Sequence, residues 1–254
     1  MLDPILETVR RRLPTVVDEE ASFRRTAGDA ASPRSLKAAL SNPGLAVIAE
    51  VKRRSPSRGD IDRSLDPGAL ATSYEAGGAA AISVLTEPDH FAGSPGDLQQ
   101  ARAAVSLPVL RKDFMLHPAQ IWESRVMGAD AVLLIVAALD DPDLKELLAE
   151  AGDAGLDALV EVHTAEEAER AAAAGADLIG VNNRDLTTFE VDLGTAEALR
   201  GRLPDTAVTV AESGVSSPEG ADRMARAGYD AILVGEAAVR APNTSDFVAS
   251  LVGS

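Results

Sequence analysis

Eight short apolar segments alternate with longer segments of helical periodicity, and this alternation constrains the fold more than any other feature of the chain. Each apolar segment is rich in Val, Ile and Leu, which is typical of strands that are buried on both faces of a parallel sheet. Eight strand and helix pairs within about 200 residues predict an α/β fold, a closed (βα)8 barrel of the TIM type. The expected strands are residues 45–52, 81–87, 109–114, 131–137, 158–163, 178–184, 207–213 and 231–237.

Two kinds of boundary residue support this count of strands. Gly128, Gly175 and Gly228 each stand three residues before the start of an expected strand, as glycines at the ends of helices do. Pro67 and Pro95 stand in the first turn of expected helices, where the fixed φ of proline suits the backbone. The first strand runs into the sequence KRRSP, whereas an open dinucleotide-binding sheet has a glycine-rich turn there. The boundaries therefore favour the barrel over an open, doubly wound sheet.

The chain has 254 residues, and we expect residues 1–254 to form a single barrel domain. Residues 1–44 precede the first strand and are expected to be an N-terminal helical extension. Helical stretches are predicted near residues 4–12 and 35–40. Residues 45–254 then form the barrel itself.

Composition excludes several classes of function. The net charge of −16 would repel nucleic acid and anionic membranes, so neither is expected as a partner. The absence of cysteine removes disulfides, thiolate metal sites and cysteine nucleophiles, and the three histidines share no metal-ligand spacing. No apolar run approaches the roughly 20 residues that span a bilayer. No secretory signal is visible at the N-terminus, so we expect a cytoplasmic protein.

The basic residues are unevenly divided, with four lysines against twenty arginines. Many carboxylates with few lysines suit a salt-adapted surface, because high ionic strength screens the repulsion between the carboxylates. A GC-rich genome that favours codons for Arg, Ala, Asp and Gly would produce the same composition. Both explanations stay open at the level of sequence.

Polar residues gather at the carboxyl ends of the expected strands, where barrels of this class place their active sites. Two lysines and three glutamates are predicted to converge on one cavity, where they must form ion pairs or change their pKa values. Such a cavity offers acids and bases, and its lysines attract an anionic ligand. The alternative explanation is that these polar residues form ion pairs with a purely structural role. It would account for one polar strand end but not for seven. The polar residues at these strand ends include Glu50, Lys52, Lys112, Glu161, Asn182 and Glu212.

The last two strands end in a pattern typical of a phosphate site. Ser213 and Gly214 stand at the end of the seventh expected strand, and Gly235 stands near the end of the eighth, beside the two loops where barrels commonly bind phosphate. A hydroxyl and glycine-flanked amides are therefore expected to hold the phosphate. Glu236 comes next, and we expect its carboxylate to point away from a bound phosphate.

The run IAEVKRRSPS at residues 48–57 resembles the first-strand signature of the indole-3-glycerol phosphate synthase family. The resemblance continues in order and spacing over essentially the whole barrel, and the family's N-terminal extension is also present. The further matching runs are LTE at 85–87, FAGS at 91–94, LRKDF at 110–114, DAVLLI at 130–135, VEVH at 160–163, GVNNRDL at 180–186 and ESG at 212–214.

The resemblance implies a (βα)8 barrel and a carboxy-lyase of tryptophan biosynthesis. Such an enzyme converts 1-(2-carboxyphenylamino)-1-deoxyribulose 5-phosphate to indole-3-glycerol phosphate with loss of CO2 and water. The implied partner is this small anionic substrate, which carries a phosphate and a carboxylate. No cofactor and no metal are implied.

The resemblance also assigns roles to residues of this chain. Lys112 resembles the general acid of ring closure, while Glu161 and Lys52 share the acid and base work of dehydration, with the division of steps open. Glu50, Asn182 and Glu212 resemble residues that orient the lysines and the sugar hydroxyls. The implied substrate contacts are Ser55 in the first loop, Phe91, Phe114 and Leu133 for the anthranilate ring, Arg184 for the carboxylate, and Ser213, Gly214 and Gly235 for the phosphate. For Leu133, a place in the ordinary barrel core is an equal alternative.

Two other classes of function stay open. The first is another phosphate-binding barrel of amino-acid biosynthesis, such as phosphoribosylanthranilate isomerase or the tryptophan synthase α subunit. The isomerase relies on a cysteine base, which this chain lacks, and neither rival carries two lysines placed like Lys52 and Lys112. The second is a barrel that binds sugar phosphates without catalysis, which the intact acid and base set disfavours.

We expect the protein to be a monomer or a weak homo-oligomer.

Overall fold

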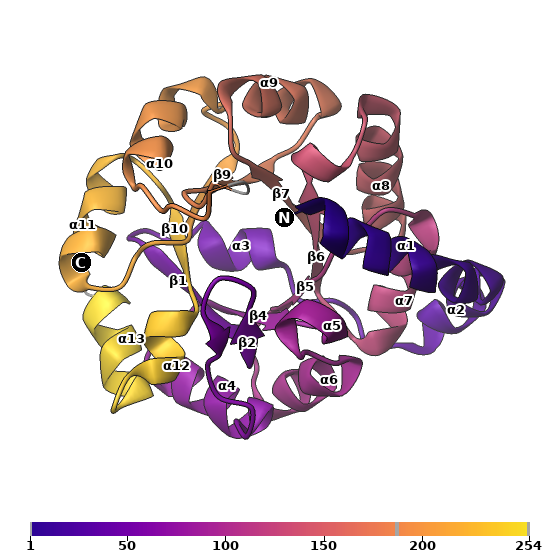
Figure 1. Cartoon of the computed structure of the whole chain (residues 1–254), viewed down its shortest axis with the longest axis horizontal. Coiled ribbons are helices and arrows are strands. Elements are labelled where there is room, and N and C mark those ends of the chain that lie inside the picture. Colours follow the sequence, from indigo (N-terminus) through magenta and orange to yellow (C-terminus); the bar gives the residue numbers. More distant parts are fainter. Residues whose placement is uncertain (1, 186–187, 253–254) are drawn as a thin grey trace.

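The computed structural model describes residues 2–185 and 188–252, and within them eight parallel strands close into a barrel (Figure 1). Each strand pairs with its neighbours in the ring, and β1 closes the ring between β10 and β4. The predicted (βα)8 class is confirmed, and no strand end differs from its predicted position by more than three residues. The barrel strands are β1 (Ala46–Val51), β4 (Ala81–Leu85), β5 (Val109–Lys112), β6 (Ala131–Ile135), β7 (Asp157–Val162), β8 (Leu178–Asn182), β9 (Val208–Glu212) and β10 (Ala231–Val234).

Helices form the outer layer of the barrel, and two very short strands, β2 (Arg54–Ser55) and β3 (Gly59–Asp60), form a hairpin in the first loop. Ser94 and Ser217 cap their helices by accepting a hydrogen bond from a backbone amide, and a proline follows each, as predicted. No helix in the described part of the chain has both the length and the apolar composition needed to cross a bilayer. The outer helices are α4 (Pro67–Ala76), α5 (Pro88–Phe91), α6 (Pro95–Ala104), α7 (Pro118–Met127), α8 (Asp141–Asp153), α9 (Ala165–Ala174), α10 (Gly194–Leu199), α11 (Pro218–Arg226), α12 (Glu236–Arg240) and α13 (Thr244–Val252).

The N-terminal extension contains α1 (Leu2–Asp18), α2 (Glu20–Thr26) and α3 (Leu36–Leu40). Both predicted helical stretches are present, as α1 and α3. α1 is longer than predicted because it continues through Pro14, and α2 was not predicted. Proline lacks an amide hydrogen and usually ends or kinks a helix, so the local sequence does not favour this continuation. Packing on the barrel stabilises it: α2 packs against α7, and the Arg24 guanidinium lies 4.7 Å from the ring centroid of Trp122.

Helix α3 closes the amino-terminal end of the barrel. Its side chains Leu36 and Leu40 are fully buried and pack with the inward residues of the strands, such as Ile48 and Leu159. Figure 1 looks along the barrel and shows α3 within the ring of strands, whereas α1 crosses the view in front of it. The extension therefore contributes to both ends of the barrel.

Side chains alternate along each strand between the barrel interior and the layer under the helices. On β1, Val47 packs outward and Ile48 inward, so that the next inward residue is Glu50. On β5, Leu110 points inward, and the next inward residue is Lys112. The same two-residue step places Glu161, Asn182 and Glu212 at the ends of β7, β8 and β9. An apolar lower layer thus supports a polar upper layer at the carboxyl end of the barrel.

Candidate active site

A cavity of about 590 Å³ opens at the carboxyl ends of the strands. Every site residue predicted from the sequence lines it, although these residues come from six of the eight barrel strands and from the segments that follow the strands. The catalytic candidates in its wall are Glu50, Lys52, Lys112, Glu161, Asn182 and Glu212. The binding candidates are Ser55, Phe91, Phe114, Leu133, Arg184, Ser213, Gly214 and Gly235.

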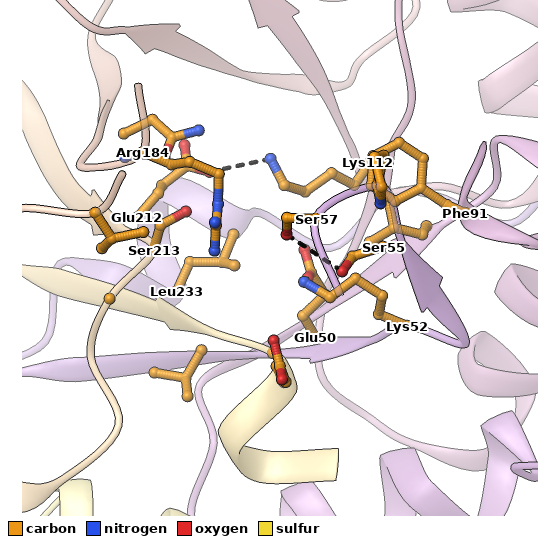
Figure 2. Close-up of a pocket in the computed structure, with 18 of the residues that line it drawn as sticks. Glu50, Lys52, Ser55, Ser57, Phe91, Lys112, Arg184, Glu212, Ser213 and Leu233 are labelled. Atoms are coloured by element: carbon orange, nitrogen blue, oxygen red, sulfur yellow. Dashed lines mark hydrogen bonds and ion pairs between the residues drawn. The ribbon is translucent and has the colours of Figure 1, made fainter. Parts of the chain in front are cut away.

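Lys112 joins two carboxylates across the barrel. Its Nζ lies 3.0 Å from Oε2 of Glu161 and 3.0 Å from Oε2 of Glu212, and Figure 2 shows the side chain extending toward Glu212. Burial alone would lower the pKa of Lys112, but the charges of Glu161 and Glu212 outweigh it and hold the pKa above its usual range. The amino group therefore carries a full complement of protons at neutral pH.

The two carboxylates beside Lys112 differ in their protonation. Burial would raise the pKa of Glu161, but the charges of Lys112 and His163 hold it well below its usual range. For Glu212 burial prevails over the attraction of Lys112 and raises its pKa to about 7. One oxygen of Glu212, Oε1, is buried without a hydrogen-bond partner. The site thus holds one firmly ionised carboxylate and one that exchanges a proton near neutral pH.

Gly180 on β8 provides the space for the unpaired oxygen of Glu212. A Cβ atom at residue 180 would overlap this Oε1 and would lie 3.2 Å from the carboxyl carbon of Glu212. The same Cβ would lie 3.3 Å from Cδ1 of Leu159. Because Gly180 has no side chain, the Glu212 carboxylate is able to occupy this space.

A second ion pair lies at the end of β1. Nζ of Lys52 is 2.6 Å from Oε1 of Glu50, and the Ser83 hydroxyl lies 3.5 Å from the other oxygen of Glu50. A Cβ at position 235 would lie 2.5 Å from Oε1 of Glu50 and 3.1 Å from Nζ of Lys52. Gly235 therefore makes room for this pair.

Two neighbouring asparagines connect the ends of β7, β8 and β9. Asn182 points inward and donates from Nδ2 to Oε1 of Glu161, at 3.1 Å. Asn183 points outward, where its Nδ2 donates to the backbone carbonyl oxygens of Glu212 and Ser213, each at 3.1 Å. The first contact orients a catalytic candidate, and the second fixes the start of the loop that follows β9.

An apolar wall stands at one side of the cavity. The rings of Phe91 and Phe114 lie with their centroids 6.2 Å apart at an interplanar angle of 36°. Phe91 is held by Glu87, which is fully buried and accepts hydrogen bonds from three amides of α5. Leu133 on β6 both packs in the barrel interior and lines the cavity, so the two interpretations of this residue are compatible.

The loop after β9 has an unusual backbone. Ser213 has φ of +64° and Gly214 has φ of +90°, so two successive residues adopt left-handed conformations. This conformation is strained for a serine and persists only where the surrounding structure enforces it. A Cβ at position 214 would lie 2.6 Å from Cγ1 of Val191, so glycine also permits close approach of the loop that follows β8.

Glu236 lines the cavity at the end of β10. Its expected orientation away from a bound phosphate stays a prediction. Its carboxylate lies 3.2 Å from Nε of Arg240 and 4.0 Å from Nε of Arg58. Two arginines therefore offset the negative charge at this end of the cavity, and both line the cavity themselves.

Several lining residues were not identified from the sequence. Leu2 and Ile5 reach the cavity from α1, and Phe189 reaches it from the loop after β8. Their positions depend on how α1 and this loop pack, and no strand-end pattern marks them. Arg53 belongs to the matched first-strand run but turns outward, where it forms two contacts of 2.9 and 3.0 Å with Asp97 on α6. Leu186, the last residue of another matched run, lies outside the described residues.

Comparison with known proteins agrees with this geometry. The model of the family described as indole-3-glycerol phosphate synthase matches residues 2–251. The chain belongs to the indole-3-glycerol phosphate synthase family. An indole-3-glycerol phosphate synthase of Mycolicibacterium gilvum (strain PYR-GCK) is 51% identical, over 99% of this chain and 93% of the relative. Another member of the family, from Kineococcus radiotolerans, is 49% identical over 100% of this chain and 95% of the relative.

One solved structure has a similar barrel although its sequence is different. Thiamine phosphate pyrophosphorylase from Pyrococcus furiosus is similar with a TM-score of 0.63, over 82% of this chain and 93% of that chain. The two sequences are 18% identical, so the likeness concerns the fold alone. The barrel fold alone therefore does not distinguish this family from others. The assignment to the indole-3-glycerol phosphate synthase family rests on the sequence comparisons.

Proposed function

We propose that this chain converts 1-(2-carboxyphenylamino)-1-deoxyribulose 5-phosphate to indole-3-glycerol phosphate, CO2 and water in tryptophan biosynthesis. The observation that carries the proposal is the buried ammonium group of Lys112, held at 3.0 Å from both Glu161 and Glu212 inside the cavity. The family and its similar members support the same reaction.

The cavity suits the two ends of this substrate. The anthranilate ring fits the apolar wall of Phe91 and Phe114, with Leu133 below it. The phosphate fits the opposite end, at the Ser213 hydroxyl and the glycine amides that follow β9 and β10. We assign the substrate carboxylate to Arg184, whose side chain also lines the cavity. Binding at both ends bends the substrate so that its two reacting carbons approach each other.

Ring closure is the first chemical step. The ring carbon that bears the carboxylate attacks the ketone carbon of the sugar, and the ketone oxygen becomes a hydroxyl group. This oxygen needs a proton as the new bond forms, and the ammonium group of Lys112 donates it. Glu161 and Glu212 hold Lys112 in its protonated form and fix its direction. A positioned acid of this kind accelerates such a step by roughly 10²-fold to 10⁴-fold.

Decarboxylation and dehydration complete the reaction. Loss of CO2 returns the bonding electrons to the six-membered ring and restores its aromaticity. Loss of water then needs a proton for the departing hydroxyl group and a base for the proton that leaves the five-membered ring. Glu161 is ionised and serves as the base, while Lys52, paired with Glu50 at 2.6 Å, serves as the acid.

The direct test is an assay with the purified protein. Mixing the protein with the carboxyphenylamino-deoxyribulose phosphate produces the fluorescence of an indole if the proposal is right, and the product is then identified by mass. Saturable binding of the substrate without any product contradicts the proposal and indicates a barrel that binds sugar phosphates without catalysis.

The proposal extends to the setting of the enzyme. We expect it to act in the cytoplasm as a monomer or weak homo-oligomer, with residues 1–254 as one domain. Among the described residues, the exposed large hydrophobic side chains are Val126, Val191 and Val252, which belong to three separate segments. Single exposed apolar side chains of this kind are ordinary on the surface of a monomer. Light scattering during size-exclusion chromatography measures the mass, and one calorimetric unfolding transition is expected for one domain.

A further inference from the structure

His163 stands directly behind a catalytic candidate. It follows β7 by one residue, and its side chain is 10% exposed. Its Nε2 lies 3.3 Å from Oε1 of Glu161, and its Nδ1 lies 3.3 Å from Oε2 of Glu167. His163 is not among the residues that line the cavity, so it meets the substrate only through Glu161.

The start of α9 holds this histidine in place. The Thr164 hydroxyl caps the helix by accepting a hydrogen bond from the Glu167 amide, at 3.2 Å. The Glu167 carboxylate reaches back and accepts from the His163 amide at 2.7 Å, which is a capping box extended by one residue. Glu167 is therefore fixed by the backbone, and so is the carboxylate that faces the imidazole. This arrangement exists without any contribution from the substrate.

The two carboxylates keep the imidazole positively charged. Burial would lower the pKa of His163, but Glu161 and Glu167 outweigh it and raise the pKa to about 10. Nε2 of His163 is buried without a hydrogen bond, so its contact with Glu161 is an attraction between charges. The other groups that face Glu161 are Lys112 from β5, the Asn182 amide from β8 and, beyond Lys112, the carboxylate of Glu212 from β9.

The need for a second cation follows from the proposed reaction. Before ring closure, Lys112 supplies a positive charge at 3.0 Å from Glu161. Donation of a proton to the substrate removes that charge. A buried carboxylate beside a neutral amine favours its protonated form, because burial disfavours the charged one. Glu161 would then lose its capacity to act as a base in the later step.

We propose that His163 is a positioning residue that acts through Glu161: its imidazolium keeps this carboxylate ionised and in place after Lys112 has given up its proton. The inference rests on the proposed function, because it concerns the order of proton transfers in that reaction. Glu167 contributes to the same arrangement, because its carboxylate stabilises the positive charge of the imidazolium.

The decisive variant is His163→Asn, which removes the charge and keeps a polar side chain of similar reach. We expect kcat at neutral pH to fall by about tenfold with KM nearly unchanged. In the profile of kcat against pH, the acid limb is expected to move to higher pH by about one unit. An opposite charge at this distance lowers a carboxyl pKa by roughly 1 to 3 units, so removing the imidazolium raises the pKa of Glu161. His163→Lys restores a cation and is expected to return the limb toward its original position.

The matched control is Glu166→Gln, which removes the charge of an exposed carboxylate in the first turn of α9, next to Glu167. The carboxylates that pair with His163 are those of Glu161 and Glu167. We expect the profile of Glu166→Gln to match that of the unaltered protein. Thermal unfolding of each variant shows whether it is folded. If the His163→Asn protein is folded and its acid limb does not move, the inference is wrong.

A second measurement does not depend on catalysis. Titration of the imidazole ring protons by NMR, with His163 assigned from the His163→Asn spectrum, is expected to show a pKa near 10. Glu167→Gln is expected to lower it. Titration of His163 near the usual value of about 6.5 overturns the inference. A protein that shows this high pKa but never forms an indole overturns the proposed function, and with it the catalytic role of His163.

Discussion

Gly180→Ala adds one methyl group against the most tightly placed carboxylate of the site. The new Cβ overlaps Oε1 of Glu212 and lies 3.2 Å from its carboxyl carbon, whereas unstrained carbon contacts begin at about 3.5 Å. The other near neighbour, Cδ1 of Leu159, lies at 3.3 Å and needs only a small displacement. The carboxylate of Glu212 must therefore move by about 1 Å, and it carries one of the two contacts of Lys112.

A displacement of about 1 Å in catalytic geometry costs on the order of 10²-fold in rate. We expect kcat of Gly180→Ala to fall by about this factor. KM is expected to change little, because the phosphate and ring sites do not include residue 180. The assay is the steady-state formation of indole fluorescence from the carboxyphenylamino-deoxyribulose phosphate, with thermal unfolding recorded in parallel.

Gly152→Ala is the matched control. Residue 152 lies in the last turn of α8, and a Cβ there meets nothing within 4 Å. Replacing a helical glycine by alanine is expected to add roughly 0.5 to 1 kcal/mol of stability and to leave kcat unchanged. A Gly180→Ala protein that is folded and keeps kcat within threefold of the unaltered protein would falsify the claim that this glycine sets the position of Glu212.

Three further substitutions and one change of solvent are expected to give distinct outcomes. Lys112→Ala should lower kcat by roughly 10²-fold to 10⁴-fold while product binding changes far less, and a residual rate within threefold removes Lys112 from the mechanism. Gly235→Asp should raise KM sharply, since it places a negative charge at the proposed phosphate end, and should also lower kcat, since its Cβ displaces Glu50. An unchanged KM in a stable protein indicates that the phosphate binds elsewhere. The pKa of about 7 for Glu212 means that the folded state binds a proton that the unfolded state releases near pH 4.5, so stability falls between these values as pH rises. Glu212→Gln should flatten that part of the curve of thermal midpoint against pH, and an unchanged slope contradicts the raised pKa. Molar KCl should raise the thermal midpoint steeply if the acidic surface is a salt adaptation, with sulfate as the comparison for salting out, and a flat midpoint leaves codon usage as the explanation.

The strands and the residues at their ends were predictable because both obey short-range rules. A parallel strand buried on both faces needs a continuous apolar run, so Ala131 to Ile135 is recognisable without any knowledge of its neighbours. The two-residue period then places the inward polar residue directly above an inward apolar one, as with Leu110 and Lys112. Since parallel strands share one carboxyl end, residues distant in sequence meet in one cavity.

The features that were not predictable depend on packing between distant segments. Leu2 and Ile5 reach the cavity only because α1 and α2 pack across α7, and nothing near residue 5 in the sequence records that contact. The continuation of α1 through Pro14 also opposes the local preference of the chain. The charge on His163 requires two carboxylates, one of which is brought to it by the cap of α9.

The plug formed by α3 has a consequence for how the chain folds as it is synthesised. Arg34 and Lys37 dock through hydrogen bonds to Asp130, Asp157 and Asp177, which follow them in the chain by 96, 120 and 140 residues. At about 5 to 20 residues per second, the ribosome needs roughly 5 to 30 seconds to deliver these partners. The apolar side chains of the plug, Leu36 and Leu40, have nothing to enter until then. Residues 34–40 are therefore synthesised before the partners on which they dock, and Leu36 and Leu40 stay unpacked in the interval.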